Sequence, residues 1–111
     1  IPDLRVDPEK MKQVVINLIN NARDALVENQ DRGVLAIKTY VEDGAVLIAF
    51  QDSGPGIPDE IINKVFEPFF TTKESGSGIG LSISQEIMKL HNGSVSVVSL
   101  KDGATSFLVE F

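Results

Sequence analysis

The sequence contains no cysteine, no tryptophan and a single histidine. Without cysteine there is no disulfide framework, no thiolate zinc site and no cysteine nucleophile, and one histidine excludes a multi-histidine metal site. A membrane-spanning helix needs about 20 consecutive apolar residues, and no such run is present. We therefore expect a soluble fragment that makes no direct membrane contact. Its N-terminus also lacks the basic and then apolar pattern of a signal peptide.

Basic residues are scarce as well. The sequence has 10 Lys and Arg against 16 Asp and Glu, which gives a formal net charge of -6. Because the basic residues are spread along the chain, it lacks the positive patch that nucleic-acid binding requires, and we expect no nucleic-acid partner. The absence of cysteine fits a reducing compartment, so a cytoplasmic domain is expected. With 111 residues, the chain is long enough for one hydrophobic core, and residues 1–111 are predicted to form a single domain.

Local patterns predict three helices and four strands. A first helix is expected from Asp7 to Glu28, because Asp7 can cap it, Pro8 suits the first helical position and apolar residues then recur at helical spacing. The other predicted elements are strands at 34–41, 46–50, 94–100 and 105–111 and helices at 59–65 and 79–90. Since strands and helices do not alternate regularly, the order favours an α+β domain with helices on one face of a mostly antiparallel sheet.

Polar motifs mark two places where chemistry is expected. Asn17 and Asn21 lie one turn apart on one flank of the first helix, and their neutral oxygens suit Mg²⁺, although a pair of surface amides is the ordinary alternative. Asp52 follows an apolar strand, where a carboxylate can accept a hydrogen bond from an exocyclic amine. Gly54 and Gly56 follow it and would let the backbone approach a planar ring, although an ordinary turn would use the same residues.

A glycine-rich segment leads into the helix predicted at 79–90. Gly76, Gly78 and Gly80 are placed there, where bare backbone amides and the positive end of a helix dipole can bind an anion. Its spacing matches neither a Walker A loop nor the GxGxxG of dinucleotide folds. Lys73 precedes these glycines and could reach a phosphate, although a lone lysine in a loop is usually only solvated. Thr105 enters the last strand after what is, taken alone, an ordinary hairpin turn.

Together these motifs resemble the catalytic and ATP-binding domain of sensor histidine kinases, within the gyrase, heat-shock, histidine-kinase and mismatch-repair ATPase superfamily. The stretches similar to its N, G1, F and G2 boxes are, in order, Asn17–Ala22, Asp52–Gly56, Phe66–Phe70 and Gly76–Leu81. Only residues 71–75 separate the last two boxes, which resembles the short-lid type of kinase. The resemblance implies a two-layer α/β sandwich of the Bergerat type, with a mixed, mostly antiparallel sheet covered on one face by about three helices.

The resemblance also implies a role for each motif residue. Asn21 would bind Mg²⁺, Asn17 would support the phosphate end of the site, and Lys73 would be a cation of the ATP lid; these three are the catalytic candidates. Asp52 would bond the adenine amino group, with Thr105 near the base. The other residues expected to contact the nucleotide are two apolar side chains and five glycines, namely Ile57, Leu81, Gly54, Gly56, Gly76, Gly78 and Gly80.

Position 17 also bears on the reaction. Relatives that hydrolyse ATP usually carry Glu one helical turn before the Mg²⁺-binding asparagine, where this chain has Asn17. Because an amide cannot act as a general base at neutral pH, we expect phosphoryl transfer rather than hydrolysis. The expected function is to bind Mg-ATP and donate its γ-phosphate to a histidine on a separate dimerisation and phosphoacceptor domain, of the same or a paired chain. ADP would leave, and a response regulator would be an indirect partner in two-component signal transduction.

Two other functions share these motifs: an anti-sigma type of serine kinase and a non-catalytic module for nucleotide sensing or partner binding. The second is suggested by Asp24, which stands where the family often has Lys or Arg, with Arg23 one position earlier. It is also suggested by Phe66–Phe70, which would anchor the lid, meet the phosphoacceptor domain or simply pack in the core. For His91, at the end of a predicted helix and outside any motif like HExxNP, a structural role is expected.

Overall fold

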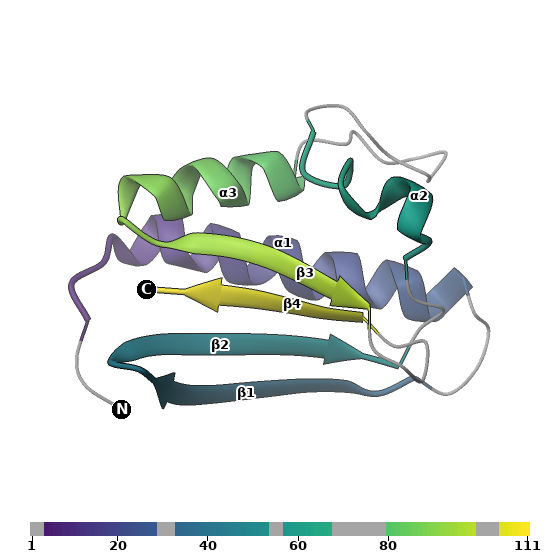
Figure 1. Cartoon of the computed structure of the whole chain (residues 1–111), viewed down its shortest axis with the longest axis horizontal. Helices are drawn as coiled ribbons and strands as arrows, with labels where there is room; N and C mark the ends of the chain where they lie inside the picture. Colours follow the sequence, from purple (N-terminus) through teal and green to yellow (C-terminus); the bar gives the residue numbers. More distant parts are fainter. Residues whose placement is uncertain (1–3, 29–32, 54–56, 68–79, 100–104) are drawn as a thin grey trace.

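The computed structural model describes residues 4–28, 33–53, 57–67, 80–99 and 105–111 (Figure 1). In chain order its elements are α1 (Pro8–Glu28), β1 (Leu35–Glu42), β2 (Ala45–Asp52), α2 (Asp59–Ile62), α3 (Gly80–Leu90), β3 (Ser94–Ser99) and β4 (Thr105–Glu110). Each corresponds to an element predicted from the sequence. The largest difference is in α2, where regular helix ends at Ile62 and turns follow, whereas the sequence predicted a helix over 59–65.

The described strands form one sheet in the order β1-β2-β4-β3. Every neighbouring pair is antiparallel. The last strand of the chain therefore lies between β2 and β3 and joins the two hairpins into one layer (Figure 1). This confirms the α+β fold and the mostly antiparallel sheet. The sheet was predicted to be mixed, but no parallel pair occurs among the strands within the described ranges.

The hairpin of β1 and β2 closes through Asp43 and Gly44, which have φ angles of 52° and 82°. Two central residues with positive φ make the tight turn whose twist matches that of the flanking strands. The turn fixes the register of the ladder, at the far end of which Leu35 pairs with Asp52. Asp52 is thus placed at the end of the sheet opposite the turn.

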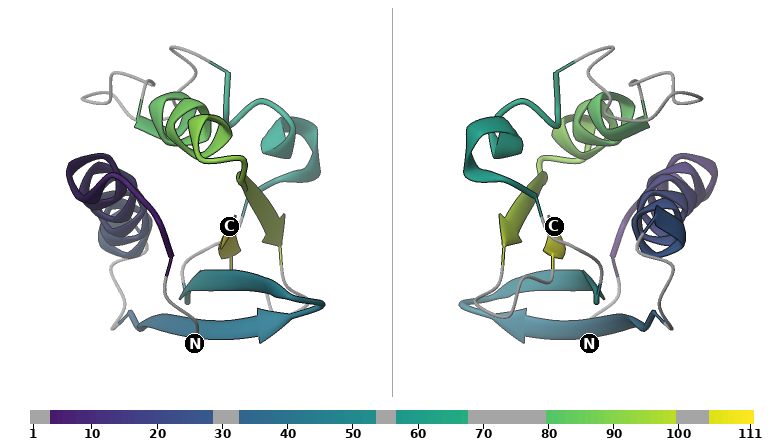
Figure 2. Two further views of the ribbon diagram at one scale, coloured as in Figure 1. Left: turned by 90° about the vertical axis from the view of Figure 1, so that its left-hand side faces the viewer. Right: turned by 90° about the vertical axis from the view of Figure 1, so that its right-hand side faces the viewer.

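The helices cover one face of the sheet (Figure 2). Leu18 of α1 and Met88 of α3 pack with Phe50 of β2 and Phe107 of β4 in one core cluster, and none of the four is more than 2% exposed. Burial of a side chain of this size stabilises the fold by roughly 1.5–3 kcal/mol, so the cluster holds both helices on the sheet. Because side chains alternate along a strand, the residues two positions from Phe50 and Phe107 also face the helices.

The first helix begins where the sequence predicted. The carboxylate of Asp7 accepts hydrogen bonds from the backbone N–H groups of Glu9 at 3.0 Å and Lys10 at 3.3 Å. The N–H groups of the first turn have no acceptor within the helix. Asp7 supplies one and is therefore the N-cap of α1. Although α1 is 21 residues long, no helix in the described part of the chain is both long and apolar enough to cross a membrane.

Candidate functional site

Two polar side chains lie side by side at the end of the sheet opposite the turn between β1 and β2. Asp52 ends β2, Thr105 begins β4, and the two are direct cross-strand partners. Their exposures are only 3% and 4%. Asp52 lies two residues after Phe50, and Thr105 two residues before Phe107, so both side chains point to the helix-covered face. The end of the sheet therefore presents a buried carboxylate beside a buried hydroxyl.

The backbone directly after Asp52 is well anchored. Ser53 continues the pairing with the first hairpin strand, because its N–H donates to the Val34 carbonyl at 3.0 Å and its Oγ accepts from the Val34 N–H at 2.8 Å. Ile57 and Leu81 are half-buried and pack against the core cluster. The two residues predicted to contact a ring thus pack against the same core cluster, which includes Phe50 of β2 and Phe107 of β4.

The same end of the molecule also receives the start of the third helix. Figure 1 shows that β2 ends and β4 begins on the side where α2 lies, and that α3 starts beside α2. On α1, the Asn17 side chain reaches this start: its Nδ2 donates to the Gly80 carbonyl at 3.1 Å and to Ser84 Oγ at 3.2 Å. The predicted residues Asn17 and Gly80, which are 63 positions apart in the sequence, are therefore in contact.

The orientation of the Asn17 amide follows from these partners. The Gly80 carbonyl can only accept a hydrogen bond, so the nitrogen of the amide must face it. Neither bond uses the oxygen, Oδ1. Asn21 is half-buried one turn further along α1 and therefore lies on the same flank of the helix. Two neutral amides, one with its nitrogen committed to the protein, suit a hard cation such as Mg²⁺ that retains other oxygen ligands.

Sequence reasoning missed one residue of this cluster, Ser84. Its side chain is completely buried, and its Oγ also lies 3.0 Å from the Gly80 carbonyl. The available signal was its position four residues after Gly80, on the helix face that carries the core residues Ile87 and Met88. A serine on such a face must bond to a polar partner, because an unpaired buried hydroxyl is costly.

Several predicted site residues lie outside the described residues, so the structure does not test their roles: Gly54, Gly56, Lys73, Gly76 and Gly78. The same holds for the last part of the phenylalanine motif. Its first member, Phe66, is half-buried and meets Phe107 edge-to-face, with ring centroids 6.3 Å apart and planes at 82°. For Phe66, core packing is therefore the interpretation that the structure supports.

Arg23, the basic residue next to the unusual Asp24, forms an ion pair with it at the surface. Arg23 and Asp24 lie 3.9 Å apart, with side chains 68% and 43% exposed. An ion pair this exposed is weak, because water screens both charges. Arg23 therefore faces solvent beside Asp24 on the helix.

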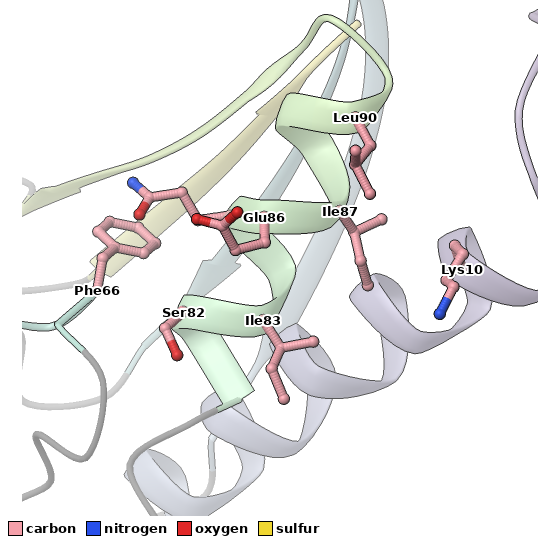
Figure 3. Close-up of a pocket in the computed structure, with 8 residues that line it drawn as sticks. Lys10, Phe66, Ser82, Ile83, Glu86, Ile87 and Leu90 are labelled. Atoms are coloured by element: carbon pink, nitrogen blue, oxygen red, sulfur yellow. The ribbon is translucent and has the colours of Figure 1, made fainter.

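A separate depression lies on the surface of α3. Lys10 and Phe66 line its two sides, and the rest of its lining comes from α3 (Figure 3). Ile83 and Ile87 lie on the side of α3 that faces α1, whereas Glu86 points away from it. None of the amides on α1 and neither member of the buried pair on the sheet lines this depression, so it is distinct from the candidate site.

One protein family matches nearly the whole chain. The family described as "Histidine kinase-, DNA gyrase B-, and HSP90-like ATPase" covers residues 6–111. The fold and this match define the class, which is an ATPase domain with helices on one face of an antiparallel sheet. The chain belongs to this family, and within it to the catalytic domains of histidine kinases.

The most similar proteins include curated kinases. AtoS of Escherichia coli strain K12, a signal transduction histidine-protein kinase, is 41% identical over 108 residues, which are 96% of this chain and 17% of AtoS. Sporulation kinase A of Bacillus subtilis strain 168 is 37% identical over 105 residues, which are 95% of this chain and 17% of that protein. The chain thus spans less than a fifth of the length of either relative. These findings confirm the resemblance to sensor histidine kinases.

Solved structures contain the same fold. The catalytic domain of histidine kinase ThkA superposes with a TM-score of 0.83 at 34% identity, over 97% of this chain and 70% of that one. Full-length ShkA, whose structure is in complex with AMPPNP, gives a TM-score of 0.82 at 26% identity, over 99% of this chain and 23% of that one.

Proposed function

We propose that this chain binds Mg-ATP and donates the γ-phosphoryl group to a histidine on a separate dimerisation and phosphoacceptor domain. The observation that carries the proposal is the buried pair of Asp52 and Thr105 at the end of the sheet near which α3 begins. The family is one of ATPases, and the similar ShkA has a structure in complex with AMPPNP.

The buried pair suits recognition of adenine. A carboxylate only accepts hydrogen bonds, so Asp52 matches the exocyclic amino group of adenine. Guanine carries a carbonyl oxygen at the equivalent ring position, which would face the carboxylate with a second acceptor. Because a site built for one hydrogen-bonding pattern rejects the opposite pattern strongly, ATP should be preferred to GTP. Thr105 would lie near the base, and Ile57 and Leu81 would contact its faces.

The amides of the first helix support the phosphate end of the site. Asn21 would bind Mg²⁺, and Asn17 would present its amide oxygen to the same region. A bound Mg²⁺ would neutralise charge on the phosphates. Lys73 and the glycines at 76, 78 and 80 would complete the contacts from the lid, with Gly54 and Gly56 near the base.

Transfer rather than hydrolysis is favoured by Asn17, since its amide cannot remove a proton from water. In the proposed step, the bond between the γ-phosphorus and the β,γ-bridging oxygen breaks, and a bond forms between phosphorus and an imidazole nitrogen of the acceptor. ADP leaves with the electron pair, and the imidazole loses a proton. Such a transfer requires mainly positioning and neutralisation of charge.

The acceptor histidine would come from another domain, because His91 is already engaged. Its Nε2 accepts the Asp7 backbone N–H at 3.0 Å, and Nδ1 therefore carries the proton and donates to the Ile87 carbonyl at 2.9 Å. Residues 1–111 would form one domain of a longer kinase in the cytoplasm, whose acceptor domain lies in the same or a paired chain and whose phosphoryl group passes on to a response regulator.

Isothermal titration calorimetry tests the nucleotide site. The parent chain should bind Mg-ATP, and Asp52→Asn should weaken binding by about tenfold to a hundredfold, because a hydrogen bond to a charged group contributes about 1.5–3 kcal/mol. Asn21→Ala should also weaken the affinity for Mg-ATP. Asp43→Asn makes the same chemical change at an exposed turn position and should leave the affinity unchanged. No binding by the parent, or equal binding by Asp52→Asn, would contradict the proposal.

A further inference from the structure

The first and third helices run antiparallel and meet through polar contacts at two places. Asn17 of α1 bonds to the start of α3, and the backbone of Asp7 bonds to His91 just after α3 ends. On α3, the residues that face α1 recur at spacings of three or four, which keeps them on one side of the helix. Ser84 occupies this side, one turn after Gly80.

The three polar groups at the start of α3 form a closed triangle. Asn17 Nδ2 lies 3.1 Å from the Gly80 carbonyl oxygen and 3.2 Å from Ser84 Oγ, and Ser84 Oγ lies 3.0 Å from the same carbonyl. The carbonyl only accepts, so the Ser84 hydroxyl donates to it and accepts from Asn17. The nitrogen of the Asn17 amide is thus turned toward Gly80 and Ser84.

This arrangement decides what Asn17 can offer a ligand. Phosphate oxygens are acceptors and would need a donor, but the nitrogen of the amide is turned toward Gly80 and Ser84. What remains is Oδ1, which pairs with a cation or with a donor such as metal-bound water. Asn17 is therefore suited to the metal and not to the phosphate oxygens themselves.

We propose that Ser84 is a positioning residue for nucleotide binding: its buried hydroxyl fixes the orientation of the Asn17 amide and so directs Oδ1 toward the divalent cation. The inference deepens the proposed function and rests on it. Ser84 does not itself touch ATP or Mg²⁺. Without it, the amide loses one of its two anchors and can rotate, which weakens binding of the metal but leaves recognition of the base intact.

Ser84→Ala tests this role through the metal dependence of nucleotide binding. The affinity for ADP is measured by calorimetry, once with Mg²⁺ and once with EDTA. The ratio of the affinity with Mg²⁺ to the affinity with EDTA is called the metal gain. A hydrogen bond of ordinary strength corresponds to about a twofold to tenfold change in an equilibrium constant, so Ser84→Ala should reduce the metal gain by that factor. The affinity in EDTA should stay the same. Ser96→Ala, at an exposed position on β3, is the matched control and should behave as the parent.

The amide itself gives a second readout that needs no ligand. In the parent, the side-chain NH₂ protons of Asn17 should exchange slowly with water, as followed by NMR, and Ser84→Ala should speed this exchange. Ser84→Cys, with a weaker acceptor of similar size, should lie between the two and serves if Ser84→Ala fails to fold. An unchanged metal gain together with unchanged amide signals would overturn the role of Ser84. If the parent did not bind Mg-ADP, the proposed function itself would fail, whereas slow amide exchange would still confirm the anchor.

Discussion

At the scale of single residues, Gly93 lies where the end of α3 meets the end of β4. Its N–H donates to the Met88 carbonyl at 2.8 Å, which closes the last turn of the helix. The left-handed conformation at this end belongs to Asn92, with a φ of 59°. A Cβ on Gly93 would instead collide with the Glu110 carbonyl oxygen and come within 2.8 Å of Met88 Cε. Lack of volume, rather than backbone freedom, is what this position requires.

Gly93→Ala should therefore destabilise the fold through steric overlap. We expect a loss of about 2–3 kcal/mol, since a backbone carbonyl in a strand cannot give way as a side chain can. Urea denaturation measures it. Gly44→Asn is the matched control: Gly44 has a φ of 82° with no atom near its Cβ position, and asparagine tolerates this conformation. The control should change the free energy of unfolding little, and equal losses for the two variants would refute the steric explanation.

At the scale of elements, hydrogen bonds join α1 and α3 at the start of α3 and just after its end. The contact after the end of α3 depends on a neutral His91. The Asp7 backbone N–H can only donate, so His91 Nε2 must accept it, and its Nδ1 proton is given to the Ile87 carbonyl. The same residue, Asp7, caps α1 through its carboxylate. One residue thus starts the first helix and joins it to the last turn of the third. The structural role expected for His91 is supported by these contacts.

The helix cap and the bond to His91 can be tested separately by mutation. The cap uses the carboxylate of Asp7, whereas the bond to His91 uses its backbone N–H. Asp7→Ala removes the acceptor for the Glu9 and Lys10 N–H groups and should cost about 1 kcal/mol of stability in urea denaturation. Asp7→Asn keeps an acceptor oxygen and should lose much less. In both variants the His91 ring should remain the Nδ1–H tautomer by NMR. A change of the His91 tautomer in Asp7→Ala would show that the cap and the bond between Asp7 and His91 are not independent.

The elements themselves were largely predictable because their signals are local. Asp7 and Pro8 are typical of a helix start and predict the beginning of α1. Asp43 and Gly44 are residues that favour a tight turn, and they close the hairpin. Asp52 could be chosen as a site residue because it ends an apolar strand. The predicted helix over 79–90 also ends where α3 ends, at Leu90, and Asn92 then adopts the left-handed conformation.

Contacts across the fold were not predictable from such signals. Ser84 and Asn17 are 67 positions apart, and nothing in either neighbourhood indicates that a serine on the buried face of α3 would bond to an amide on α1. The position of β4 between β2 and β3 is likewise a result of packing, not of local propensity. The pairing of Asp52 with Thr105 follows from that strand order, so their burial side by side emerged only in the fold.

At the scale of the whole molecule, the charge of -6 is compatible with a phosphate ligand if the phosphates are held by a metal and by backbone amides. The chain would then need no basic patch. The buried pair on the sheet and the amides on α1 would supply opposite ends of one nucleotide site. What such a domain lacks by itself is an acceptor, since both ring nitrogens of its only histidine are engaged with Asp7 and Ile87.

The isolated chain should accordingly bind ATP without labelling itself. When it is incubated with γ-labelled ATP and Mg²⁺, no covalent label should appear, because no histidine is available to accept it. Fusion to a dimerisation and phosphoacceptor domain should give a label that is lost in acid and kept in alkali, as expected of a phosphorus–nitrogen bond, and Asp52→Asn in the fusion should reduce its rate of formation. An acid-stable label would identify a serine kinase instead. ATP binding with no label in the fusion would leave a nucleotide-sensing module as the function of this fold.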